Sequence, residues 1–159
     1  MNDFTARKLG EVLAFAEVSL DTFSRGKDAL IRVLGEEMYA TIISENRTHA
    51  ETIKKISENA GTQTLDSTIK KCEATGLKLC SMRDLYVGDQ WDNATELLEW
   101  SGFFEGAALV HWALISGCAA ALHQSELIAL ALSATNLHDK ILHTASQLLT
   151  QVGTKRAVE

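Results

Sequence analysis

Apolar residues recur at steps of three and four along most of the chain, the spacing that places them on one face of an α-helix. The first such stretch covers residues 3–24 and stops at Gly26. A second covers residues 27–61, and its length allows a kink near Gly35. Because the connection between the two is short, we expect them to be antiparallel neighbours.

The pattern changes between residues 62 and 90, where Gly76 and Gly88 interrupt a weaker periodicity. We interpret this segment as one or two shorter helices that form a crossover. Strong helical periodicity returns over residues 93–122 and again over residues 125–153. These two stretches predict a second hairpin.

Together, these elements predict an all-α protein, a ferritin-like four-helix bundle of two antiparallel hairpins joined by a long helical crossover. The bundle would occupy residues 1–153 as one domain, and residues 154–159 would form a polar C-terminal tail. The composition agrees, because the chain contains no proline and 46% of its residues are hydrophobic.

Charge and composition argue against several functions and locations. A net charge of −6 without a basic stripe argues against nucleic-acid binding. The N-terminal residues lack the basic-then-apolar order of a secretory signal. Residues 106–122 are short for a bilayer and contain His111, so we expect no membrane span. Three cysteines without paired-ligand spacing suit reduced thiols in a cytoplasmic protein.

The stretch 100–122 is almost wholly apolar and yet carries Glu105. Burying an unpaired carboxylate is costly, so this side chain requires a cation, a metal ion or a retained proton. An ion pair across the bundle, to Arg47 or to a lysine, is one solution. A metal site is another, and a retained proton is the third.

The two halves of the chain resemble each other around their acidic positions. The sequence Phe-x-Glu occurs at Glu17 and again at Glu105. From Glu17 the chain runs 28 residues to Glu45 and 32 to His49; from Glu105 it runs 30 residues to Thr135 and 34 to Asp139. The similar offsets suggest the same hairpin used twice, with a slightly longer second turn.

Pairs of residues four apart lie on one helix face, and single carboxylates that face such pairs are the layout of a dimetal carboxylate site. The candidate metal ligands are Glu17, Glu45, His49, Glu105 and Asp139. His138 is the alternative ligand if the register differs by one residue. Oxygen-rich ligands with one imidazole suit iron or manganese. A solvated helix face is the competing interpretation of Glu45 and His49.

Residues 45–61, ENRTHAETIKKISENAG, resemble the second helix of the YciF-like ferritin-like proteins, in which a Glu precedes a His by four residues and an apolar step leads to a Gly. Residues 70–74 are similar to the crossover of that family, and residues 139–142 to the end of its fourth helix. Glu17 and Glu105 fall where the family keeps its single-helix carboxylates.

The resemblance implies a homodimer, a dinuclear iron or manganese site and a role associated with stress responses. Thr135 stands where the family carries an acid on its fourth helix, so the metal site would be incomplete. Oxidation of ferrous iron or reduction of peroxide would be the chemistry of an active site of this kind. Whether the chain is an enzyme stays open.

Two other functions compete with the metal site. The density of Gly and Ala between residues 102 and 121 permits close helix approach and favours a non-catalytic bundle that acts as an oligomeric interaction module. Acid–base catalysis by Glu105 and His111 is disfavoured, because six residues of helix place them on roughly opposite sides. No nucleophile or phosphate-binding motif accompanies them.

Overall fold

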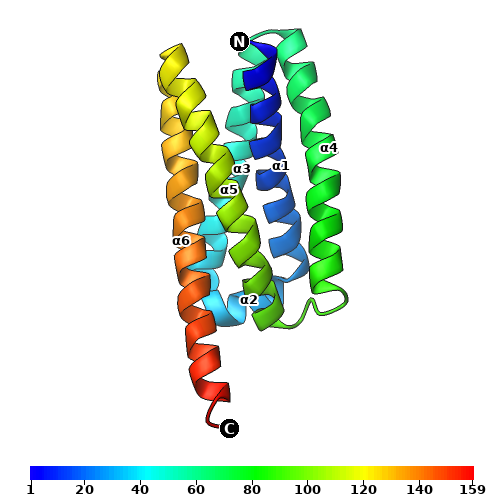
Figure 1. The fold of residues 1–159 in the computed structure, drawn as a ribbon, viewed down its shortest axis with the longest axis vertical. Helices are drawn as coiled ribbons and strands as arrows, with labels where there is room; N and C mark the ends of the chain where they lie inside the picture. The colour runs from blue at the N-terminus through cyan, green and yellow to red at the C-terminus, as the bar shows by residue number, and fades with distance from the viewer.

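The computed structural model describes residues 1–159, and its regular structure is entirely helical (Figure 1). The all-α prediction is therefore confirmed. The helices are α1 (Asp3–Arg25), α2 (Lys27–Leu34), α3 (Glu36–Asn59), α4 (Thr62–Val87), α5 (Ala94–Leu122) and α6 (Ser125–Arg156). All except α2 are long enough to run the length of the bundle, and α6 projects beyond it towards the C-terminus (Figure 1).

Two helix pairings dominate the packing. Helix α1 packs along α4 and also contacts α3, while α5 packs along α6. Contacts of α1 with α5, and of α3 with α6, join the two groups around one core. The largest fully buried apolar side chains are Trp112, Phe15, Leu9, Leu13, Leu30, Ile42, Ile53, Leu97, Ile115 and Leu127.

The structure agrees with one predicted irregularity and corrects two predicted helix ends. The stretch 27–61 is interrupted at Gly35, where a kink was expected, and the φ of 81° at this residue separates α2 from α3. The segment 62–90, predicted as one or two shorter helices, contains the single 26-residue helix α4. Helix α6 continues past Gly153 to Arg156. A helical glycine costs only about 1 kcal/mol relative to alanine. The packing of α4 along α1 therefore outweighs the tendency of Gly76 to end the helix.

Helices α1 and α4 approach each other closely at Gly10. A Cβ atom at this position would lie 2.3 Å from the carbonyl oxygen of Thr68 and 2.8 Å from Cβ of Lys71. The hydroxyl of Thr68 lies 3.1 Å from the carbonyl oxygen of Ala6. The missing side chain of Gly10 therefore sets the distance between the two helix backbones.

Candidate functional site

The most deeply buried acid of the chain is Glu105 on α5. Its carboxylate is hydrogen-bonded to Nδ1 of His138 on α6, and both residues are 1% exposed. The partner of Glu105 is thus His138, and not Arg47 or a lysine as the sequence suggested. This contact joins the two helices of the second hairpin in the middle of the apolar interior.

A second buried histidine, His49 on α3, lies in the same region. Its Nε2 is 3.0 Å from the hydroxyl of Ser133 on α6, and its ring packs edge-on to Trp112 at 6.2 Å between centroids. Burial, together with the nearby charge of His138, lowers the pKa of His49 to about 4. The ring is therefore neutral at pH 7 and acts as a hydrogen-bonding group between α3 and α6.

The contact between Ser133 and His49 has the donor and acceptor types of a nucleophile and its base, but it lacks the remaining parts of a catalytic site. Nδ1 of His49 is buried and has no hydrogen-bond partner, so no carboxylate orients the ring. Both residues lie inside helices, where the backbone N–H groups are already bonded and cannot form an oxyanion hole. The geometry supports helix pairing and not acyl transfer.

The five residues proposed as metal ligands do not form one donor set. Glu17 is half-exposed on α1, where its carboxylate accepts hydrogen bonds from Lys54 Nζ at 2.8 Å and Cys72 Sγ at 3.4 Å. Asp139 is exposed on α6. Glu45 is half-buried on α3 and takes part in no ion pair. Only Glu105 and His49 are buried in the same part of the interior.

These side chains, as placed, do not fit a dinuclear carboxylate centre. Such a centre needs carboxylates that converge from four helices, whereas Glu17 pairs with Lys54 at the surface and Glu105 is bonded to His138 in the interior. No group of three or more His, Cys, Asp or Glu side chains is arranged to hold a metal ion.

Sequence reasoning missed a second buried acid, Glu11 on α1. Its carboxylate lies 2.9 Å from Lys8 Nζ, 3.1 Å from Lys71 Nζ and 3.0 Å from Nδ1 of His111. Burial opposes the charge, but hydrogen bonds from the two ammonium groups outweigh it and lower the pKa of Glu11 below its usual value. The position could have been found, because an acid inside the run Leu9 to Phe15 presents the same problem as Glu105.

The thiol of Cys72 faces the α1 side of α4 and is not poised for chemistry. Burial, followed by the neighbouring carboxylate of Glu17, raises its pKa to about 12. A thiol with this pKa carries almost no thiolate at pH 7 and is a poor nucleophile or metal ligand. All three cysteines of the chain are free thiols in the structure.

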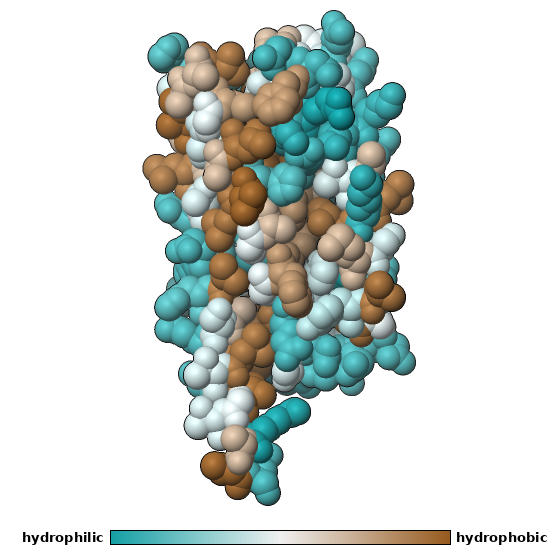
Figure 2. All heavy atoms as spheres, viewed as in Figure 1, coloured by the Kyte–Doolittle hydropathy of each residue, from teal (hydrophilic) through white to brown (hydrophobic).

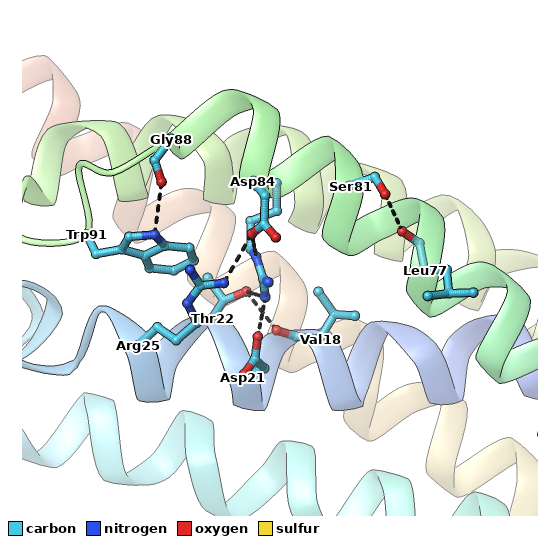
Figure 3. Close-up of polar contacts among 10 residues, drawn as sticks. Val18, Asp21, Thr22, Arg25, Leu77, Ser81, Asp84, Gly88 and Trp91 are labelled. Carbon is cyan, nitrogen blue, oxygen red and sulfur yellow. Dashed lines mark hydrogen bonds and ion pairs between the residues drawn. The ribbon is translucent and has the colours of Figure 1, made fainter.

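A further polar cluster lies at the other end of α1 and α4, where Asp21, Thr22 and Asp84 lie close together (Figure 3). Its central residue is Arg83, which bonds all three. The side chain of Arg83 is 2% exposed and donates to Asp21 at 2.6 Å, to Asp84 at 2.9 Å and to the hydroxyl of Thr22 at 3.2 Å. Burial disfavours its charge, but the bonds to Asp84 and Asp21 prevail and raise its pKa. The guanidinium is therefore satisfied within the fold.

Trp91 closes the same cluster from the loop between α4 and α5 (Figure 3). Its Nε1 donates to the carbonyl oxygen of Gly88 at 3.0 Å, and the guanidinium of Arg25 lies 3.6 Å from the ring centroid. Arg25 also bonds Asp84 at 3.2 Å. Cation–π and ionic contacts thus tie the end of α1 to the end of α4 and to the following loop.

The remaining unusual feature is the outer side of the α5–α6 hairpin. On the face drawn in Figure 2, apolar side chains follow α5 and the adjoining part of α6. The large apolar residues exposed on α5 and α6 are Phe103, Val110, Leu114, Leu122, Ile128 and Leu132. By length and composition, α5 is the one helix that could cross a membrane, a weak criterion that core helices also meet, and 33% of its most apolar window is buried.

No protein-family model, curated protein or solved structure matches the chain. The candidate site therefore follows from the structure alone, and it has two parts. Its interior part is a set of paired polar side chains that join helices, and its outer part is an apolar face on α5 and α6. The two parts share α5, whose inner side carries Glu105 and whose outer side is exposed.

Proposed function

We propose that the protein is a non-catalytic helical bundle that acts as an interaction module and assembles as a homodimer. The observation that carries this proposal is the exposed apolar face of α5. Contiguous apolar surface on a soluble monomer is usually limited, and larger patches mark interaction sites. Phe103 and Val110 are 64% and 70% exposed, although both belong to the most apolar helix of the chain.

The interior polar groups support a structural role. Glu105 is bonded to His138 on another helix, and Glu11 is bonded to Lys71 and His111 on two other helices. Buried charges that are paired and hydrogen-bonded in this way tolerate burial without a cofactor. Neither acid therefore requires a catalytic explanation.

The same proposal includes the arrangement of the helices into two hairpins and a crossover. In a ferritin-like arrangement, α1 with α3 and α5 with α6 would be the two hairpins, and α4 would be the crossover. The packing of α5 along α6 and the contact of α1 with α3 support this interpretation, although α1 packs more extensively along α4 than along α3. A cytoplasmic location would suit the three free thiols.

Size-exclusion chromatography with light scattering tests the assembly. We expect the wild-type chain to elute as a dimer and to keep the same mass after treatment with a chelator, because the proposed contact is apolar. A monomer at all accessible concentrations would contradict the proposal. A mass that falls when metal is removed would point to a metal-dependent assembly instead.

A second candidate function is iron or manganese binding with a role in stress responses. The observation in its favour is that Glu105, His138 and His49 lie in one part of the interior. A metal ion would have to displace the bond between Glu105 and His138. Elemental analysis of protein purified from iron- and manganese-supplied cells tests this: metal bound in the wild type and lost in Glu105→Gln would support it, and metal-free wild type would reject it.

A further inference from the structure

The exposed side of α5 carries a regular stripe with steps of four and three residues. We call it the α5 stripe, and its members are Phe103, Ala107, Val110, Leu114, Gly117 and Ala121. All six are exposed. Alternating steps of four and three are the spacing of the contact positions in a two-stranded coiled coil. The inner side of the same helix is already used, because Phe104, Ala108, Trp112 and Ile115 are buried in the core.

The composition of α5 favours a protein partner over a lipid surface. Between Ala94 and Leu122 the helix contains no lysine or arginine, and its charged residues are all acidic. Helices that lie on membranes are typically rich in basic residues on their polar side, which attract anionic lipids. A chain of net charge −6 would be repelled by such a surface.

The α5 stripe is complementary to itself when two copies run antiparallel. If the two-fold axis passes beside residue 112, Phe103 lies opposite Ala121 of the second copy, and Ala107 lies opposite Gly117. Val110 then lies opposite Leu114 on either side of the axis. A coiled-coil repeat has two contact positions, and in each of these layers one kind of position faces the other, as in antiparallel coiled coils. The largest side chain, Phe103, faces the small side chain of Ala121.

Small residues beside the stripe permit close contact. Gly106, Ala113 and Ala120 recur every seven residues along one edge, and nothing lies within 4 Å of a Cβ atom placed on Gly106 or Gly117. The stripe is about 27 Å long at 1.5 Å per residue, and Ile128 and Leu132 add exposed apolar area on α6. A homodimer interface of ordinary size buries about 800 Å² per chain, so the proposed contact would include α6 residues beside the stripe.

We propose that the occupant of this face is a second copy of the chain, bound through antiparallel packing of α5 against α5 with Phe103 opposite Ala121. This inference rests on the proposed function, and it adds the face, the direction and the register. Tyr86 of α4, which packs against Phe103 at 5.4 Å between ring centroids, holds the first residue of the stripe in place.

The first test places a charge in the stripe. Val110→Lys should raise the dissociation constant of the dimer at least about tenfold, because the lysine would be desolvated next to Leu114 of the partner. The control is Leu85→Lys on α4, which is 88% exposed and outside the stripe, and should leave the mass unchanged. Val110 is already 70% exposed, so the variant should fold, and circular dichroism verifies this.

The second test reads the register by disulfide cross-linking. In chains that also carry Cys118→Ala, a mixture of Phe103→Cys chains and Ala121→Cys chains should form the mixed disulfide dimer on mild oxidation, whereas neither variant alone should cross-link. The native thiol of Cys118 is removed because it would lie one helical turn from residue 121. In the antiparallel register, the two copies of residue 103 are about 27 Å apart. Chains with Cys118→Ala alone give the background.

The outcomes separate this inference from the proposed function. Cross-linking of Phe103→Cys with itself, or a dimer that survives Val110→Lys, would overturn the α5 register while leaving a homodimer in place. A monomeric wild type without cross-links would overturn both. Co-sedimentation of a monomeric wild type with vesicles of phosphatidylcholine and phosphatidylserine would assign the face to a lipid surface and reject the second copy.

Discussion

Individual side chains explain how this apolar bundle tolerates charged groups. Glu105 takes its hydrogen bond from His138, and Glu11 takes its own from two lysines and a histidine. Removing one member of such a pair leaves the other buried without a partner, which costs more than the pair itself contributes. Exposed pairs contribute much less, because water screens them.

Glu105→Ala should therefore lower the free energy of unfolding by about 3 kcal/mol, since it leaves His138 buried and unpaired. Glu17→Ala is the matched control, because Glu17 pairs with Lys54 at the surface and should change stability by less than about 1 kcal/mol. Urea denaturation of both variants measures the difference. Equal effects would mean that the interior pair has no special role.

The stability of the protein should fall as the pH is lowered from 6.5 towards 4, because of His49. The pKa of this histidine is about 4 in the folded chain and about 6.5 when unfolded, so the unfolded state binds the extra proton in this range. The contribution is fully present above pH 6.5, and at pH 5 about 2 kcal/mol of it should be lost.

Denaturation curves at pH 7 and pH 5 measure this loss. His49→Gln should reduce the dependence on pH, whereas His143→Gln, at an exposed position on α6, should retain it. A pH dependence that is unchanged in His49→Gln would show that the ring is accessible to protons in the folded chain.

The sequence anticipated part of the site at this scale. The apolar run around Glu105 predicted that the acid is buried and needs a partner. It did not identify His138, which lies 33 residues further along the chain, because helix rotation decides which side chains meet. The Phe-x-Glu similarity likewise could not show that Glu17 faces Lys54. Patterns spaced along one helix indicate burial more reliably than they indicate partners.

Among the helices, α1 and α4 approach each other closely at a single glycine, Gly10. Gly10 and Gly76 are both helical glycines, but their surroundings differ. A Cβ atom on Gly10 would collide with the backbone of α4, whereas a Cβ atom on Gly76 would meet nothing within 4 Å. Substitutions at the two positions therefore distinguish the effect of packing on stability from the effect of helix propensity.

Gly10→Ala should destabilise the protein by about 2 kcal/mol or more, since α1 and α4 must move apart. Gly76→Ala should stabilise it by about 0.5–1 kcal/mol, because alanine favours helix more than glycine does. Thermal and urea denaturation of the two variants compare the signs. Destabilisation of similar size in both would argue against a close approach at Gly10.

Helix type and approximate extent were predictable, but helix continuity was not. Periodicity identified the long helices, and Gly35 was anticipated as the weak point of the second stretch. The continuity of α4 through Gly76 and of α6 through Gly153 was missed, because the cost of a helical glycine is small compared with the gain from packing. Only the tertiary structure shows which glycines end a helix.

For the whole molecule, the unusual feature is an apolar helix that is only partly covered. One side of α5 forms the core with Trp112 and Ile115, and the other side presents the α5 stripe. The sequence pointed to this stretch through its density of small residues, but it could not show which side was left open. We propose that a second chain covers it, so that the folded monomer is the unit of a larger assembly.

Sedimentation equilibrium of the wild type, run beside Val110→Lys, addresses this proposal most directly. We expect the wild type to sediment at twice the 17.4 kDa of one chain and the variant at the mass of a single chain. A wild type that sediments at the monomer mass across the accessible concentration range would contradict the proposed assembly, and a variant that remains dimeric would contradict its assignment to α5.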